Sequence, residues 1–130
     1  MDVLVPIDGS ECSFRALSFA VDFAERYDAD CRVVHVTDAE TDATDTLVAT
    51  TREELDRLDS AANVELEVVD TLEIRAAKEV GKEILRLVEE HGFEHVVMGH
   101  HSGGAVERAI LGSAAETVVR GGTVPVTVVP

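Results

Sequence analysis

Short apolar runs alternate along this chain with segments of helical periodicity, and this alternation constrains the fold more than any other feature. The runs cover Asp2 to Asp8, Cys31 to Thr37, Val64 to Asp70, His95 to Gly99 and Val124 to Val129. Runs of this length and composition are typical of strands in a parallel sheet, and helical crossovers place helices on both of its faces. We therefore predict one α/β domain, residues 1–130, with a doubly wound five-stranded parallel sheet in the order 3-2-1-4-5.

Four segments between the runs carry apolar residues at helical spacing. They extend from Ser10 to about Asp28, from Leu47 to Ala62, from Gly81 to His91 and from Ser113 to Arg120. Residues 38–45 are acidic and are expected to form a loop. Residues 71–80 fit either an extension of the third strand or the start of the third helix, so Gly81 is either a helix start or a tolerated helix glycine. Four helices around one sheet predict a three-layer sandwich.

A glycine loop, Gly99 to Gly104, separates the fourth strand from the fourth helix. Ser113 and Glu116 have the spacing of a capping box at the start of that helix. Glycines allow the backbone to approach a ligand, and the first N–H groups of a helix are unpaired and partially positive. A strand end, a glycine loop and a helix start together predict a phosphate-binding cradle. The alternative is a connecting loop whose glycines serve only its turns.

The predicted strand order makes the first and fourth strands neighbours, and ligands bind in such sheets beyond the carboxyl ends at this switch point. Asp8 follows the first strand, and the glycine loop follows the fourth. We therefore expect Asp8 and the glycine loop to face the same crevice.

The charge balance excludes one class of partner. The sequence has 26 acidic and 11 basic residues, a net charge of −15. Nucleic-acid binding needs a basic surface, which this chain lacks. An acid-rich, lysine-poor surface suits molar salt, where the Debye length is about 3 Å and self-repulsion is screened. We expect a halophilic protein with an acidic surface; an acidic protein from an ordinary cytosol is the alternative.

No apolar run approaches the roughly 18 residues of a membrane helix, so we expect no membrane partner. The first residues, Met1 to Leu4, lack the basic start of a signal peptide, and we predict a cytoplasmic protein. Cys12 and Cys31 do not have the spacing of a metal motif. They are expected to be reduced, packed thiols at opposite ends of the sheet.

Several motifs in the right order resemble the universal stress protein family. The matching segments are Pro6 to Ser10, Val96 to Gly99, Leu111 to Ser113 and Val124 to Val129. The resemblance extends from end to end and is weakest over residues 71–80. It implies a five-stranded parallel sheet, a dimer and, as in many members of the family, ATP bound with a divalent ion.

The resemblance also implies roles for single residues. Asp8 would contact the ribose or the adenine, and Ile7 and Val36 would offer their backbone to the base. Gly99 and Gly112 would lie close to the phosphates, together with Ser113. The implied nucleotide-binding set is Ile7, Asp8, Val36, Met98, Gly99, Ser102, Gly103, Gly112, Ser113 and Ala114.

Ser102 departs from the family signature, because a glycine is expected nine residues before Gly112. If that position needs a positive φ, serine costs on the order of 1 kcal/mol. Arg108 is also the only basic residue between Met98 and Ala114. The charge of bound phosphates would therefore rest on backbone amides, the helix end and a bound Mg²⁺ or Mn²⁺ ion.

Three functions follow as hypotheses. The first is a dimeric stress-response protein that binds ATP or a related adenine nucleotide without efficient turnover and regulates an unknown protein partner. The second is a universal stress protein that binds no nucleotide and acts as an interaction module. The third is a slow metal-assisted phosphohydrolase, for which His35, His100 and His101 are candidate metal ligands near Asp8. We expect no dedicated catalytic residue.

The last apolar run, Val124 to Val129, contains Pro125 and is expected to be an edge strand. An unpaired edge of alternating valines is an association hazard. Antiparallel pairing with a second copy would bury this edge and give a twofold dimer, which the family resemblance also implies. The alternative is an edge protected by Pro125 alone.

Overall fold

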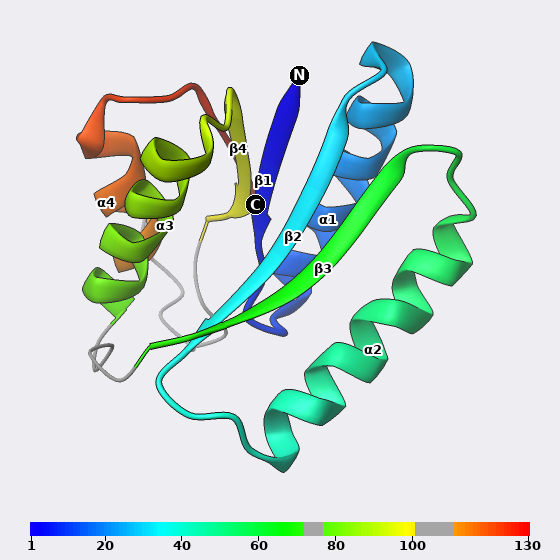
Figure 1. The fold of residues 1–130 in the computed structure, drawn as a ribbon, viewed down its shortest axis with the longest axis horizontal. Helices are drawn as coiled ribbons and strands as arrows, with labels where there is room; N and C mark the ends of the chain where they lie inside the picture. The colour runs from blue at the N-terminus through cyan, green and yellow to red at the C-terminus, as the bar shows by residue number, and fades with distance from the viewer. Residues whose placement is uncertain (72–76, 101–110) are drawn as a thin grey trace.

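A computed structural model describes residues 1–71, 77–100 and 111–130 of the chain. Its elements are β1 (Asp2–Pro6), α1 (Glu11–Tyr27), β2 (Asp30–Thr37), α2 (Asp42–Leu58), β3 (Asn63–Asp70), α3 (Ala77–His91), β4 (His95–Gly99), α4 (Ser113–Gly121) and β5 (Val126–Val129). The strands form one parallel sheet in the order β3-β2-β1-β4-β5, which confirms the predicted fold class. Figure 1 shows α3 and α4 on one side of this sheet.

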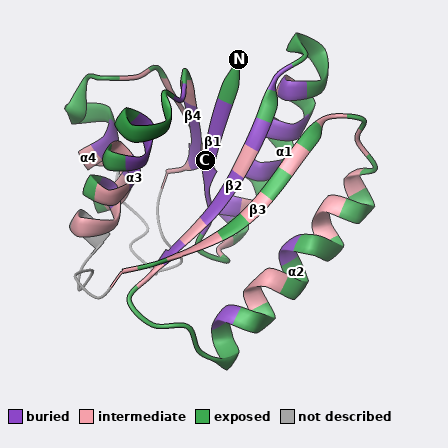
Figure 2. Cartoon of the chain, viewed as in Figure 1, coloured by how far each residue is buried: buried purple, intermediate pink, exposed green. Residues whose placement is uncertain are grey.

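Successive residues of the central strands face opposite helical layers. Val3, Val5 and Val33 pack with α1 and α2, whereas Leu4 and Val34 pack with α3 and α4. Because both faces of the sheet are covered, its strands read as continuous apolar runs rather than alternating ones. Figure 2 shows this buried centre and the more exposed outer faces of the helices. No helix among the described residues is long and apolar enough to cross a bilayer.

The switch point lies where the sequence predicts it. Val3 pairs with His95 and Leu4 pairs with Val96, so β1 and β4 are neighbours in the sheet. Their carboxyl ends therefore open onto the same edge of the sheet, beside the N-termini of α1 and α4.

Two strand boundaries differ from the prediction by two residues, whereas β2 and β3 each begin one residue early. β1 ends at Pro6 rather than Asp8, and β5 begins at Val126 rather than Val124. Pro125 lies just before β5, and its carbonyl oxygen accepts a hydrogen bond from Val96 N–H at 3.0 Å. A proline has no N–H but keeps its carbonyl, so Pro125 contributes to the sheet only as an acceptor. β5 is an edge strand, as expected.

α2 begins five residues before the predicted start at Leu47, and it ends at Leu58 rather than Ala62. The hydroxyl of Thr44 accepts a hydrogen bond from the N-cap amide of Thr41 at 3.1 Å. Asp42 and Asp45 lie in the first turn, where carboxylates interact favourably with the helix dipole. The acidic stretch that suggested a loop therefore includes a helix start.

α3 begins before Gly81, which is a helix glycine rather than a helix start. A Cβ at Gly81 would lie 2.6 Å from Thr117 Cβ and 2.9 Å from the Ala114 carbonyl oxygen. The missing side chain therefore allows α3 and α4 to approach closely. Residues 72–76, within the segment for which two predictions were open, lie outside the described residues.

The capping box predicted at α4 is wrong. The N-cap is Gly112, with φ −68° and ψ 159°, and it has no side-chain capping bond. Ser113 is instead the first helical residue, and Glu116 pairs with Arg120 at 2.8 Å. Because the helix starts one residue earlier than a serine cap at Ser113 would require, its N-cap is a glycine and the first-turn amides of α4 have no capping side chain.

Candidate functional site

A cavity lies at the carboxyl ends of β1, β2 and β4, on the face of the sheet that α3 and α4 cover. Eight residues of the predicted binding set line it: Ile7, Asp8, Val36, Met98, Gly99, Gly112, Ser113 and Ala114. Pro6, Ser13, His35, Val80, Ile84 and Ala115 also line the cavity. Ser102 and Gly103 lie outside the described residues. The fold thus brings together residues that are up to about a hundred positions apart in sequence.

The inner wall of the cavity is apolar. Val36, Ile84 and Met98 belong to the buried core between the sheet and α3/α4, and Val80 packs against that core. Apolar walls with a few placed polar groups are typical of small-molecule sites. Among the described lining residues, Asp8 is the only carboxylate and none is a lysine or arginine.

Asp8 lies in the loop between β1 and α1, and its side chain is exposed. Its Oδ1 atom accepts a hydrogen bond from Ser10 N–H at 2.9 Å, which fixes the turn. Gly9 has φ +86°, a conformation that glycine adopts without strain. The second carboxylate oxygen of Asp8 makes no hydrogen bond or ion pair with the described residues, so it can accept one from a ligand hydroxyl.

The backbone N–H and carbonyl groups of Ile7 each contact a residue of β2. Its N–H donates to Val34 O at 2.8 Å, and its carbonyl oxygen lies 2.9 Å from His35 Nδ1. Because a carbonyl oxygen can only accept, His35 Nδ1 carries the proton. The Ile7 carbonyl predicted to face a base therefore already accepts one bond and keeps one lone pair for a ligand.

The N-terminus of α4 faces the cavity through Gly112, Ser113, Ala114 and Ala115. Gly112 N–H donates to His100 O at 2.5 Å. The next three N–H groups have no partner within the helix, and the glycine N-cap offers no side-chain acceptor. These amides carry partial positive charge, which suits an anionic group.

Gly99 has a packing role in addition to lining the cavity. A Cβ at Gly99 would lie 2.6 Å from Cys12 Sγ and 3.0 Å from Ser13 N. Gly99 is also not among the described glycines with positive φ. The residue is therefore glycine because α1 packs against the end of β4, and a ligand is not needed to explain it.

The candidate metal ligands are not brought together among the described residues. His35 Nδ1 binds Ile7 O, and His100 Nδ1 lies 3.2 Å from Cys12 Sγ. His101 lies outside the described residues. Across residues 1–71, 77–100 and 111–130, no group of three or more His, Cys, Asp or Glu side chains is placed to hold a metal ion.

The clearest pKa shifts among cysteines and histidines occur away from the cavity. Burial raises the pKa of the Cys31 thiol to about 11, with a further contribution from Asp30. Burial also lowers the pKa of His95. Neither Cys31 nor His95 lines the cavity. Cys12 and Cys31 are buried free thiols, as predicted.

Sequence reasoning missed the cavity residues supplied by α3. Val80 and Ile84 lie one turn apart on α3, and the helical periodicity of Ile84 was visible in the sequence. What the pattern did not show is that Val80 and Ile84 of α3 form part of the cavity wall. The contact of His35 with Ile7 was missed because it depends on the side-chain position rather than on spacing.

Comparisons with known proteins agree with this fold. The family model described as "Universal stress protein family" matches residues 1–130. A solved universal stress protein UspA from Lactobacillus plantarum has a TM-score of 0.78 and 20% identity, with 100% of this chain and 97% of that chain covered. A universal stress protein from Archaeoglobus fulgidus in complex with dAMP gives a TM-score of 0.75 and 19% identity, covering 100% and 98%.

A universal stress protein in complex with cAMP has a TM-score of 0.73 and 24% identity, with 99% of this chain and 95% of that chain covered. At these identities the solved structures establish the similarity of fold. A comparison with curated proteins gives no match.

Proposed function

Because the chain belongs to the universal stress protein family, we propose that it binds an adenine nucleotide in the cavity between Asp8 and the N-terminus of α4. ATP with Mg²⁺ or Mn²⁺ is the proposed ligand. The observation that carries this proposal is the junction of an apolar pocket with an uncapped helix N-terminus. Such a site suits a molecule with a flat apolar part and an anionic part.

The lining residues suggest which part of the nucleotide each of them would contact. The base would lie against Val36 and Met98, in the apolar part of the cavity. The free carboxylate oxygen of Asp8 would accept a hydrogen bond from a ribose hydroxyl. The phosphates would receive hydrogen bonds from the first-turn amides of α4, which begins at Ser113.

A divalent cation belongs to the proposal because the described lining residues include no lysine or arginine. Helix-end amides contribute only partial charges, whereas ATP carries several full negative charges. A bound Mg²⁺ or Mn²⁺ ion would offset the remainder. Two solved relatives of the same fold are described with adenine nucleotides, cAMP and dAMP, which supports the choice of base.

We propose binding without efficient turnover. Hydrolysis needs a nucleophile or a water held by a general base. Ser13, the buried serine in the cavity lining, donates its hydroxyl to Ser10 O at 2.9 Å. Among the described lining residues, no serine hydroxyl is hydrogen-bonded to a histidine. A slow metal-assisted hydrolysis is accordingly the less favoured reaction.

The proposed assembly is a cytoplasmic twofold dimer that regulates a protein partner. All four residues of β5 are half-buried, and the strand forms one edge of the sheet. Pairing of two β5 strands would satisfy their outward backbone groups. Bound nucleotide would then favour one conformation of the loop that precedes α4, and a partner would recognise that conformation.

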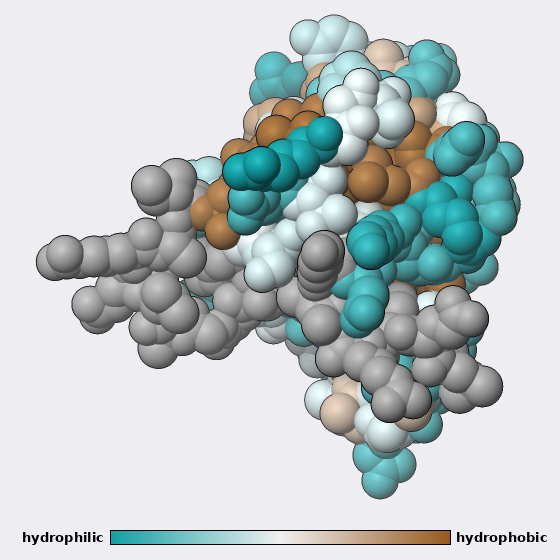
Figure 3. All heavy atoms as spheres, turned by 90° about the vertical axis from the view of Figure 1, so that its left-hand side faces the viewer, coloured by the Kyte–Doolittle hydropathy of each residue, from teal (hydrophilic) through white to brown (hydrophobic). Residues whose placement is uncertain are grey.

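The second candidate is a universal stress protein that binds no nucleotide and acts as an interaction module. The absence of a basic side chain from the described part of the cavity lining favours this candidate. Hydrophobic surface occurs in separate patches when the molecule is viewed from the side of α3 and α4 (Figure 3). One exposed apolar residue of α4 is Val119.

Calorimetric titration with ATP and Mg²⁺ or Mn²⁺ in molar KCl separates the two candidates. Saturable heat with one site per chain supports the nucleotide-binding proposal. If ATP, cAMP and AMP all give no heat of binding, the nucleotide-binding proposal is contradicted, and the interaction module becomes the favoured function. If ATP binds and binding needs a positive φ at position 102, Ser102→Gly is expected to tighten binding, whereas weaker binding would identify the serine hydroxyl as a ligand.

A further inference from the structure

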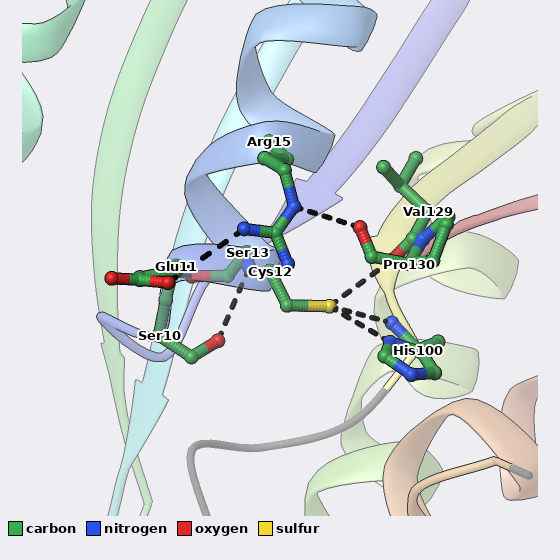
Figure 4. Close-up of polar contacts among 8 residues, drawn as sticks. All are labelled: Ser10, Glu11, Cys12, Ser13, Arg15, His100, Val129 and Pro130. Atoms are coloured by element: carbon green, nitrogen blue, oxygen red, sulfur yellow. Dashed lines mark hydrogen bonds and ion pairs between the residues drawn. The ribbon is translucent and has the colours of Figure 1, made fainter.

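Cys12 lies in the first turn of α1, at the carboxyl end of the sheet, and its side chain is only 1% exposed. Figure 4 shows the thiol pointing from α1 toward His100 and Val129. The sulfur thus lies where α1, the end of β4 and the end of β5 meet. It also fills the space that a side chain at Gly99 would occupy.

The sulfur is both donor and acceptor in this junction. Cys12 S–H donates to Val129 O at 3.1 Å, and His100 N–H donates to Cys12 Sγ at 3.0 Å. The same His100 N–H also approaches Val129 O at 2.9 Å, so it is shared between two acceptors. His100 Nδ1 lies 3.2 Å from the sulfur. One thiol therefore contacts both the backbone and the imidazole of His100.

His100 connects the Cys12 thiol to the cavity through a second hydrogen bond. Its carbonyl oxygen accepts the Gly112 N–H, and Gly112 is the N-cap of α4. A continuous path of hydrogen bonds thus leads from Cys12 through His100 to Gly112. Gly112 lines the cavity, whereas the Cys12 side chain lies on the opposite face of β4 in contact with Gly99.

We propose that Cys12 is a positioning residue of the cavity: its thiol, acting through His100, holds the N-terminus of α4 in the arrangement that binds the anionic part of the ligand. The inference about affinity rests on the proposed nucleotide binding. Removal of the sulfur would let His100 shift, and only a fraction of molecules would then have Gly112 in place. Apparent affinity falls in proportion to that fraction.

Cys31 provides a matched control within the same chain. It is also a free, buried thiol, 2% exposed, and its sulfur lies 3.5 Å from Ala20 O. It lies at the start of β2, at the amino end of the sheet, and does not line the cavity. A thiol that serves only packing should behave alike at both positions when it is replaced.

The test compares Cys12→Ala, Cys12→Ser and Cys31→Ala, first without ligand. Hydrogen exchange of single backbone amides is followed by NMR. In Cys12→Ala the Gly112 amide should exchange about three- to tenfold faster relative to the core amide of Val97, the effect of losing one hydrogen bond. Cys31→Ala should leave this ratio unchanged. Cys12→Ser retains a donor and an acceptor and should restore most of the protection.

The affinity for ATP with Mg²⁺ is measured next in the same variants. We expect a three- to tenfold weaker affinity in Cys12→Ala, about the wild-type affinity in Cys31→Ala, and partial recovery in Cys12→Ser. Equal effects of Cys12→Ala and Cys31→Ala on the Gly112 exchange ratio would overturn the inference. If wild-type protein binds no ATP, the proposed function fails, and the exchange ratios alone decide whether Cys12 positions α4.

Discussion

The imidazole of His35 donates its Nδ1 proton to the carbonyl oxygen of Ile7 across 2.9 Å, and this bond joins β2 to the loop that carries Asp8. Asp8 and His35 both line the cavity, on adjacent strand ends. The position of the proposed ribose contact therefore depends on a histidine that does not itself need to touch the ligand.

Replacing His35 should weaken both folding and binding. His35→Ala leaves the Ile7 carbonyl without its side-chain partner, which costs about 1–2 kcal/mol of unfolding free energy. Urea unfolding in molar KCl measures this loss, and calorimetry measures the expected decrease in ATP affinity. His91→Ala, at the exposed end of α3, is the control and should change stability by less than about 0.5 kcal/mol. Equal stability of the two variants would contradict the role of the His35 bond.

Much of the fold could be predicted because a strand that is buried on both faces is recognisable in the sequence as a continuous apolar run. The residues on either side of Leu4 and of Val97 are apolar and buried, and the segments between the runs are long enough to form helical crossovers. The start of α2 could not be predicted in the same way. Asp42 and Asp45 stabilise a helix start through the dipole, yet in sequence they resemble an acidic loop.

The cavity residues that follow from the strand order could be predicted, whereas those that depend on side-chain packing could not. Asp8 and Gly112 follow from the switch point of the sheet, which brings their loops to one edge. Gly99 was predicted to lie at the site, and it does line the cavity, but its contact with a cysteine on a different element was not predicted. The spacing of residues along the sequence does not predict such a contact between distant residues.

The packing of Gly99 against Cys12 predicts non-additive substitutions. Gly99→Ala places a methyl group 2.6 Å from Cys12 Sγ and should cost about 1–3 kcal/mol of unfolding free energy. Cys12→Ala removes the sulfur, so the double variant should be more stable than the sum of the two single losses predicts. Urea unfolding of all four proteins gives the coupling free energy. Strict additivity would show that the backbone contact at 3.0 Å, and not the sulfur, excludes the methyl group.

The stability of the protein should depend on pH through His95. Burial lowers the pKa of His95, and its Nε2 lies 2.8 Å from Thr127 Oγ1. The folded state binds the proton less tightly than the unfolded state, whose pKa is about 6.5. The stabilising contribution of neutral His95 is therefore complete above that value and is lost as pH falls through the folded pKa.

His95→Gln tests this pH dependence, because glutamine cannot titrate and can still hydrogen-bond to Thr127. Wild-type protein should lose more unfolding free energy than His95→Gln when the pH is lowered from about 7.5 to 5. Chemical unfolding at each pH in constant KCl provides the comparison. Parallel losses in the two proteins would assign the acid sensitivity to other groups.

The proposed dimer predicts the effect of a proline in β5. The carbonyl groups of Pro125 and Val129 accept bonds from β4, so with a period of two the backbone groups of Val126 and Val128 face away from the sheet. Val128→Pro removes an outward N–H without removing a bond to β4. Light scattering after gel filtration should give a dimer for wild type in molar KCl and a monomer for this variant.

Salt provides an independent check on the same dimer. Each chain carries a net charge of −15, and two chains repel each other strongly unless salt screens them. The Debye length rises from about 3 Å at 1 M salt to about 10 Å at 0.1 M. We expect the wild-type dimer to dissociate as KCl is lowered, so a wild-type monomer at every salt concentration would count against pairing through β5.

In the proposed complex, an adenine nucleotide binds with its phosphates at the start of α4. An amide NMR titration of wild-type protein with ATP and Mg²⁺ in molar KCl tests it most directly. We expect saturable shifts of the Ser113, Ala114 and Ala115 amides together with those of Asp8 and Val36, while the amides at the amino end of the sheet, near Asp30, stay unchanged. Shifts confined to other surfaces, or no saturable shift at all, would contradict the claim.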